Sequence, residues 1–130
     1  MITRMNIDVA PPPVYTGVST EDSTIISWIL ENYEIPPDTA DEIERFLSRN
    51  PEVLEVLKEA PFYIRRIVVG NYPLLLELVR EPEEDWEELF VVVKTDLPVE
   101  EALELDDRIF DLWFKDAMRK VVGKLEITVR

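Results

Sequence analysis

The strongest candidate for chemistry in this sequence is Asp106, a carboxylate that interrupts an apolar helical pattern. When the segment 98–121 is projected as a helix at 100° per residue, Asp106 falls in the middle of a face formed by apolar residues: Val99, Leu103, Phe110, Trp113, Ala117 and Val121. A carboxylate on a buried face must be hydrogen-bonded, paired with a cation or protonated, because an isolated buried charge costs free energy. The pattern therefore predicts that Asp106 has a specific partner or a specific task.

Two interpretations of Asp106 follow from this position. In the first, it is a poised acid in a pocket lined by Phe110 and Trp113. In the second, it is a structural anchor that hydrogen-bonds a loop or pairs with an arginine, and the candidate arginines are Arg65, Arg66 and Arg80. The sequence offers no second catalytic partner, so we favour the anchor and assign no catalytic residue. We expect a polar core or an interaction site at the following residues: Asp106, Trp113, Phe110, Arg65 and Arg66.

The composition removes several other kinds of chemistry. The chain has no Cys and no His, which excludes disulfides, thiolate nucleophiles, imidazole catalysis and zinc sites of the usual ligand type. Carboxylates remain, and Asp96 or Asp107 could act with Asp106 as acid, base or Mg²⁺ ligand in an enzyme. The acidic segment 81–88 lacks the ligand spacing of a calcium loop and is typical of a solvated hairpin turn. We therefore expect neither a metal nor a cofactor, and an enzyme is the less favoured alternative.

Charge restricts the partners of the chain. Its 28 acidic and 14 basic residues give a net charge of −14, which repels phosphate backbones and anionic lipid headgroups and so argues against nucleic acid. No apolar run approaches the ~18 residues of a membrane span, and Pro11–Pro13 falls where a signal peptide would need its apolar core. We expect a soluble, cytoplasmic protein without a membrane partner. High charge without Cys is also a compositional cue to a thermophile.

The elements that position these residues divide into two halves. In the first half of the sequence, the apolar pattern predicts helices at about 20–33, 38–49 and 51–69. Each is bounded by capping residues, prolines or a glycine. Apolar residues stay in phase through Pro61, which favours one kinked helix or two nearly collinear ones. Residues 1–18 are predicted to form an extended or flexible arm ahead of a single domain at 19–130.

In the second half of the sequence, the spacing between apolar residues changes. Three apolar runs predict strands at about 74–80, 88–95 and 124–130, and a long helix at about 98–121 connects the last two. A single crossover makes the last strand parallel to the second, and the right-handed rule allows it to lie beside the first. The predicted fold is α+β, with N-terminal helices packed on a small, mostly antiparallel three-stranded sheet. The near-continuous apolarity of 88–95 predicts a central or well-covered strand, and the order of the strands stays open.

The helix at 98–121 has more apolar surface than a sheet needs. It is apolar over more than half of its circumference once Leu105, Ile109 and Leu112 are included. A helix that covers one sheet face needs a narrower stripe, so the surplus must meet the N-terminal helices, a second copy of the chain or another protein. With the acidic charge, this surplus predicts a non-enzymatic interaction protein, either the acidic partner of a basic protein or a homo-oligomer such as a homodimer.

A set of runs in the second half forms a recognisable pattern: Pro73–Val79, Glu88–Asp96, Val99–Leu103, Asp107–Asp111 with Trp113, and Gly123–Leu125. In these runs the chain resembles a family of small uncharacterised prokaryotic proteins, and the resemblance extends back over 46–70. It implies helices followed by a strand–strand–helix–strand unit, and no established activity comes with it. Components of toxin–antitoxin pairs are similar in size and acidity, so an antitoxin-like role is one form of the expected function.

Overall fold

The computed structural model describes residues 27–130, so the predicted arm at 1–18 and the start of the first predicted helix lie outside the described residues. A helix at 27–32 precedes two longer ones, α2 (Ala40–Arg49) and α3 (Pro51–Ile67). The remaining elements are β1 (Leu74–Glu81), β2 (Trp86–Val93), α4 (Val99–Ile109), α5 (Lys115–Ala117) and β3 (Leu125–Val129). This element order confirms the predicted α+β fold, with boundaries close to those expected.

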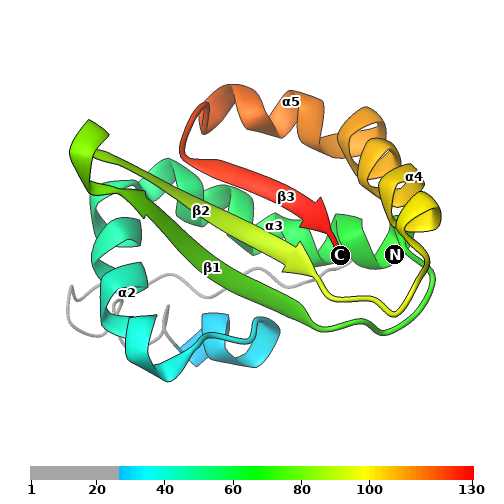
Figure 1. Cartoon of the computed structure of the whole chain (residues 1–130), viewed down its shortest axis with the longest axis horizontal. Helices are drawn as coiled ribbons and strands as arrows, with labels where there is room; N and C mark the ends of the chain where they lie inside the picture. The colour runs from blue at the N-terminus through cyan, green and yellow to red at the C-terminus, as the bar shows by residue number, and fades with distance from the viewer. Residues whose placement is uncertain (1–26) are drawn as a thin grey trace.

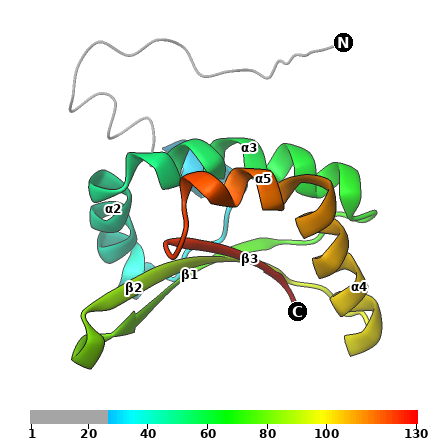
Figure 2. The same cartoon turned by 90° about the horizontal axis from the view of Figure 1, so that it is seen from above.

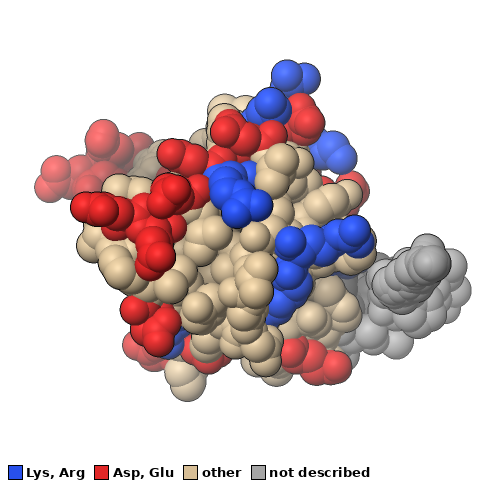
Figure 3. Space-filling model, turned by 90° about the vertical axis from the view of Figure 1, so that its right-hand side faces the viewer, with Lys and Arg blue, Asp and Glu red and all other residues tan. Residues whose placement is uncertain are grey.

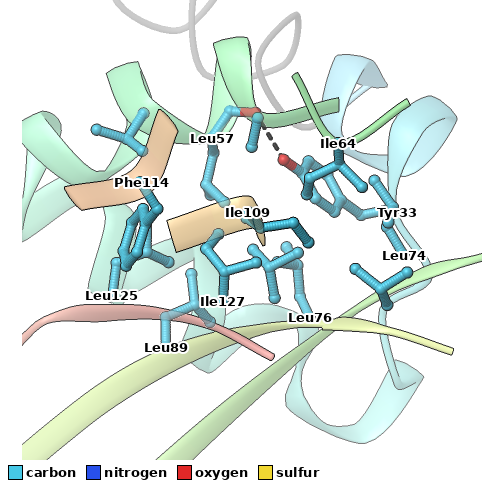
Figure 4. Packing of buried hydrophobic residues seen from close by; sticks show 14 of the residues in the cluster. Tyr33, Leu57, Ile64, Leu74, Leu76, Leu89, Ile109, Phe114, Leu125 and Ile127 are labelled. Atoms are coloured by element: carbon cyan, nitrogen blue, oxygen red, sulfur yellow. Dashed lines mark hydrogen bonds between the residues drawn. The ribbon is translucent and has the colours of Figure 1, made fainter. Parts of the chain in front are cut away.

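The described helices lie on one face of a three-stranded sheet. Figures 1 and 2 show α2, α3 and α5 above this face, whereas α4 stands at the end of the sheet where β2 finishes. Alternate strand residues, including Leu76, Val91 and Ile127, point into the helical layer and are buried. Figure 4 shows these side chains packed against Ile64, Ile109 and others from the helices. The core therefore joins the helical half to the strand half of the sequence.

The strand order differs from the prediction. β2 lies in the centre, antiparallel to β1 and parallel to β3, which confirms its central position and the direction of the crossover. The expected placement of β3 beside β1 is wrong, so the sheet is mixed rather than mostly antiparallel. The outer edge of β1 is already occupied. The Glu34 N–H donates to the Leu74 carbonyl at 2.7 Å, and the Leu76 N–H donates to the Glu34 carbonyl at 2.9 Å.

Helix α3 continues through Pro61 as one helix, in agreement with the unbroken apolar phase. A proline has no N–H, so the carbonyl four residues earlier, that of Leu57, lacks its usual helical donor. The Tyr33 hydroxyl donates to this carbonyl at 2.6 Å from the preceding helical segment (Figure 4). Burial raises the pKa of Tyr33 well above its usual range, and Arg65 offsets this only in part, so the hydroxyl keeps its proton.

The predicted helix at 98–121 is interrupted. After α4, a π-helical turn spans Phe110–Phe114, and α5 is followed by a 3-10 turn at Met118–Lys120. A π turn holds about one residue more than an α turn. Any helix face extrapolated across it at a constant 100° is therefore displaced by one residue.

This displacement corrects the predicted buried face. Trp113 within the π turn, and Ala117 and Val121 after it, are buried as expected. Before it, the buried residues are Ala102 and Ile109, each one position ahead of a residue predicted to be buried. Three residues of the predicted face are instead largely exposed: Val99 (74%), Leu103 (56%) and Phe110 (42%).

Candidate functional site

Asp106 lies half-buried at the border of the buried face of α4, in a groove of about 340 Å³. The groove runs between α4 with the π turn and the neighbouring strands β2 and β3. Its aromatic walls come from two elements: Phe90 from β2, and Phe110 and Phe114 from the π turn. Its polar lining consists of Asp106, Asp107, Glu126 and Thr128. The groove thus combines carboxylates with aromatic rings.

Strand β3 places its polar residues toward this groove by simple alternation. Leu125, Ile127 and Val129 are buried against the helices, so Glu126 and Thr128 point to the opposite face of the sheet. Glu126 is paired in register with Phe90 of β2. Its Oε1 accepts a hydrogen bond from the Ile127 N–H at 3.2 Å, which holds the carboxylate in place.

The carboxylates of this region repel one another. Burial raises the pKa of Asp106, and the negative charges of Glu126 and Asp107 raise it further. Burial also raises the pKa of Glu88 on the same sheet face, again with a contribution from Glu126. Within residues 27–130, none of these four carboxylates forms an ion pair. The described part of the site is therefore an acidic groove whose carboxylates are not paired with a Lys or Arg side chain of residues 27–130.

The arginines proposed as partners of Asp106 are engaged elsewhere. Arg65 donates to the Tyr72 carbonyl, and the Arg66 guanidinium lies 5.0 Å from the centre of the Phe62 ring. Arg80 pairs with Glu42 and Glu87, each at 2.7 Å. Among residues 27–130, Asp106 is therefore not paired with an arginine, and its carboxylate accepts no hydrogen bond from a loop, so neither form of the anchor interpretation gains support.

Trp113 also lies outside the groove. Its indole N–H donates to Glu59 Oε1 at 3.1 Å, and its ring stacks on Tyr63 with 5.1 Å between the ring centres. Of the five predicted site residues, the structure brings Asp106 and Phe110 together. It assigns Trp113 to the contact between the π turn and α3, and it leaves Arg65 and Arg66 near the end of α3.

An apolar stripe leads along α4 to this groove. Val99, Leu103 and Phe110 share one side of the helix at spacings of four and seven residues, with Asp106 and Asp107 between the last two. We call these five residues the α4 surface. Figure 3 views the molecule from the end where α4 stands, and it shows acidic side chains gathered on one side of an uncharged area, with basic side chains near its centre and on its other side.

Sequence reasoning missed Phe90, Glu126 and Thr128 as parts of the site. The sequence contains part of the information needed to find them. The alternation in 124–130 places Glu126 and Thr128 on the same face of their strand. That this face meets α4 depends on β3 lying beside β2. The incorrect strand order therefore concealed the groove.

A second groove, of about 860 Å³, lies at the hairpin and was not predicted. Its charged side chains bind one another: Glu87 accepts from Arg49 at 2.8 Å and from Arg80 at 2.7 Å. Lys124 donates to the buried Asn50 side chain at 2.6 Å. These contacts tie the hairpin and the start of β3 to the corner between α2 and α3, and they identify the second groove as a structural junction.

Neither metal ligation nor membrane insertion finds support in the described residues. Among residues 27–130, no three carboxylates are grouped so that they could hold a metal ion. A Mg²⁺-dependent reaction at Asp96, Asp106 or Asp107 thus gains no support from their arrangement. In the same range, every helix is too short or too polar to cross a membrane.

The chain matches no protein-family model, and comparisons with curated proteins and with solved structures find no match either. The resemblance to small prokaryotic proteins therefore stays a prediction. The functional argument rests on the geometry of the α4 surface and the acidic groove.

Proposed function

We propose that this chain is a non-enzymatic protein-interaction domain, the acidic partner of a basic protein, and that it docks through the α4 surface. One observation carries the proposal: the helix face that the sequence pattern predicts to be buried is exposed, and it carries carboxylates without ion-pair partners among residues 27–130. An antitoxin-like role is one form of this function.

The apolar part of the α4 surface supports a docking role. Isolated exposed apolar residues are common on proteins, but Val99, Leu103 and Phe110 follow one another along a single helix face. Such a row, bordered by polar residues, suits the groove or helix of a second protein. Burial of these side chains in a complex would contribute about 25 cal/mol for each Å² removed from water.

The charged part indicates which kind of partner fits. Asp106 and Asp107 lie within the apolar row, and the whole chain carries a net charge of −14. A second copy of the chain would bring like charges together in an isologous contact, which is unfavourable. A basic protein would be attracted at long range and would neutralise the carboxylates on contact. The surface therefore suits a basic partner better than a homodimer.

A comparative pull-down from the native host tests this function. The bait is the full chain, and the test variant carries Val99→Ser and Leu103→Ser. The control variant carries Leu30→Ser and Val122→Ser, a leucine and a valine that are similarly exposed (59% and 68%) but lie outside the α4 surface. Both variants remove the same apolar area from exposed positions, so neither is expected to unfold the chain.

We expect the wild type and the control to capture the same basic protein at low salt, and the test variant to lose at least about tenfold of it. High salt should weaken the capture, because screening acts on the attraction between charges. Equal capture by both variants, or no captured protein at low salt, would overturn the proposal.

A further inference from the structure

The acidic groove beside the α4 surface has the size of a side-chain receptor. Its volume of about 340 Å³ is near the lower end of the range for small-molecule pockets, roughly 300–1,000 Å³. A helix or a strand of another protein cannot enter a space of this size, but one long side chain projecting from it can. The α4 surface would then hold the partner's backbone element, and the groove would hold one of its residues.

The walls of the groove favour a planar cation. Phe90, Phe110 and Phe114 contribute aromatic rings from β2 and the π turn, and the faces of aromatic rings attract a guanidinium group. Phe114 is buried and therefore fixed, whereas Phe110 is half-exposed at the mouth. A guanidinium stacks on such rings through its flat face and leaves its edge for hydrogen bonds.

The oxygen acceptors in the groove suit the N–H donors at the edge of a guanidinium group. The Asp106 carboxylate accepts no hydrogen bond from the described residues, and Glu126 uses one carboxylate oxygen for the Ile127 N–H and keeps the other. Thr128 adds a hydroxyl oxygen. Arginine presents five N–H donors in a fixed fork, which suits two carboxylates better than the point charge of lysine. Arg108, the nearest basic residue along the chain, is exposed and forms no ion pair in the described range.

We propose that this groove is the receptor for one arginine side chain of the partner, with the guanidinium against the partly exposed Phe90 and Phe110 and against Asp106 and Glu126. This inference rests on the proposed function, because it specifies the residue by which the basic partner is recognised.

An NMR titration of the ¹⁵N-labelled full chain with Nα-acetyl-arginine amide tests the inference without the partner. We expect saturable shifts centred on the amides of Asp106, Phe110 and Thr128. Nα-acetyl-lysine amide should bind about threefold more weakly, because it lacks the planar fork. Nα-acetyl-citrulline amide, which has the shape of arginine but no charge, should produce no saturable shifts.

Two variants complete the test. The pair Asp106→Asn and Glu126→Gln should weaken arginine binding by about tenfold, the effect of losing charge-assisted hydrogen bonds. The pair Glu83→Gln and Glu84→Gln removes the same charge from the exposed hairpin turn and should leave binding unchanged. Equal affinity for lysine, equal loss in both variants, or shifts spread over the acidic surface without saturation would overturn the inference.

The two proposals fail in distinguishable ways. Suppose that Val99→Ser with Leu103→Ser abolishes partner capture but the groove does not bind the arginine probe. The inference of an arginine receptor is then wrong, and the proposed docking function stands. If the groove binds arginine selectively while partner capture does not depend on the α4 surface, the docking function is wrong.

Discussion

Asp106 is an anomaly both in the sequence and in the structure, but for different reasons. The helical projection placed it in the middle of a buried face and gave a loop hydrogen bond or an arginine of the same chain as its candidate partner. The structure places the described arginines elsewhere and surrounds Asp106 with Glu126 and Asp107. Burial and these two negative charges raise the pKa of Asp106, so we expect its carboxylate to oppose folding at neutral pH.

The substitution Asp106→Asn should stabilise the chain at neutral pH. The folded state raises the pKa of this carboxyl above its ordinary value of 3.8, so the folded protein holds the proton more tightly than the unfolded chain. The wild type therefore loses stability as the pH rises from that value through the raised pKa, and the Asn variant avoids this loss. The gain should be on the order of 0.5 kcal/mol, because solvent still reaches the carboxylate and screens its charge.

Urea unfolding at several pH values measures this effect, with Asp111→Asn as a control at an exposed carboxylate that does not line the groove. The gain of Asp106→Asn should be full at pH 7 and should shrink as the pH falls toward the ordinary value of 3.8. A loss of stability at pH 7 would restore the structural-anchor interpretation.

At the scale of elements, helix α3 depends on a hydrogen bond from outside itself. Removing the Tyr33 hydroxyl by Tyr33→Phe leaves the buried Leu57 carbonyl without a donor, at a cost of about 1–3 kcal/mol. In a Pro61→Ala background, the new Ala N–H can donate to that carbonyl, so the same substitution should cost about 1 kcal/mol or less.

The coupling between Tyr33→Phe and Pro61→Ala is measured with a thermodynamic cycle. The cycle compares the free energies of unfolding of the wild type, the two single variants and the double variant. A cost of Tyr33→Phe that is the same in both backgrounds would show that Pro61 is not the reason for the hydrogen bond.

The elements themselves could largely be predicted from the sequence, whereas two features of their arrangement could not. Periods of two and of about 3.6 identified the strands and helices, and the unbroken phase through Pro61 gave one helix. The π turn at Phe110–Phe114 has no distinct sequence signature, and its extra residue moved the inferred buried face from Ile109 to Phe110. Periodicity assumes a constant turn, so it cannot reveal such a displacement.

The strand order was the second such feature. A crossover helix fixes the direction of β3 relative to β2, but not the strand beside which β3 lies. That choice depends on Glu34, whose backbone occupies the outer edge of β1 from more than 35 residues away in sequence. Contacts of this kind leave no local pattern, and for that reason Phe90 and Glu126 could not be assigned to the site with Asp106.

At the scale of the whole molecule, charge and apolar exposure point to the same kind of partner. The net charge of −14 would disfavour contacts between copies of the chain and would attract a basic partner at long range. The α4 surface provides an apolar row at which an attracted protein can be held. The acidic groove beside it provides a residue-specific contact. Together these features predict that a basic partner contacts one region of the molecule rather than a diffuse acidic surface.

Site-specific photo-crosslinking in the native host tests this claim most directly. A photoreactive benzoylphenylalanine replaces Leu103 in the α4 surface or, as a control, the exposed Val122 at the turn before β3. We predict a covalent adduct with one basic protein from position 103, and no such adduct from position 122. An adduct that joins two copies of this chain, the same adducts from both positions, or no adduct from position 103 would contradict the account.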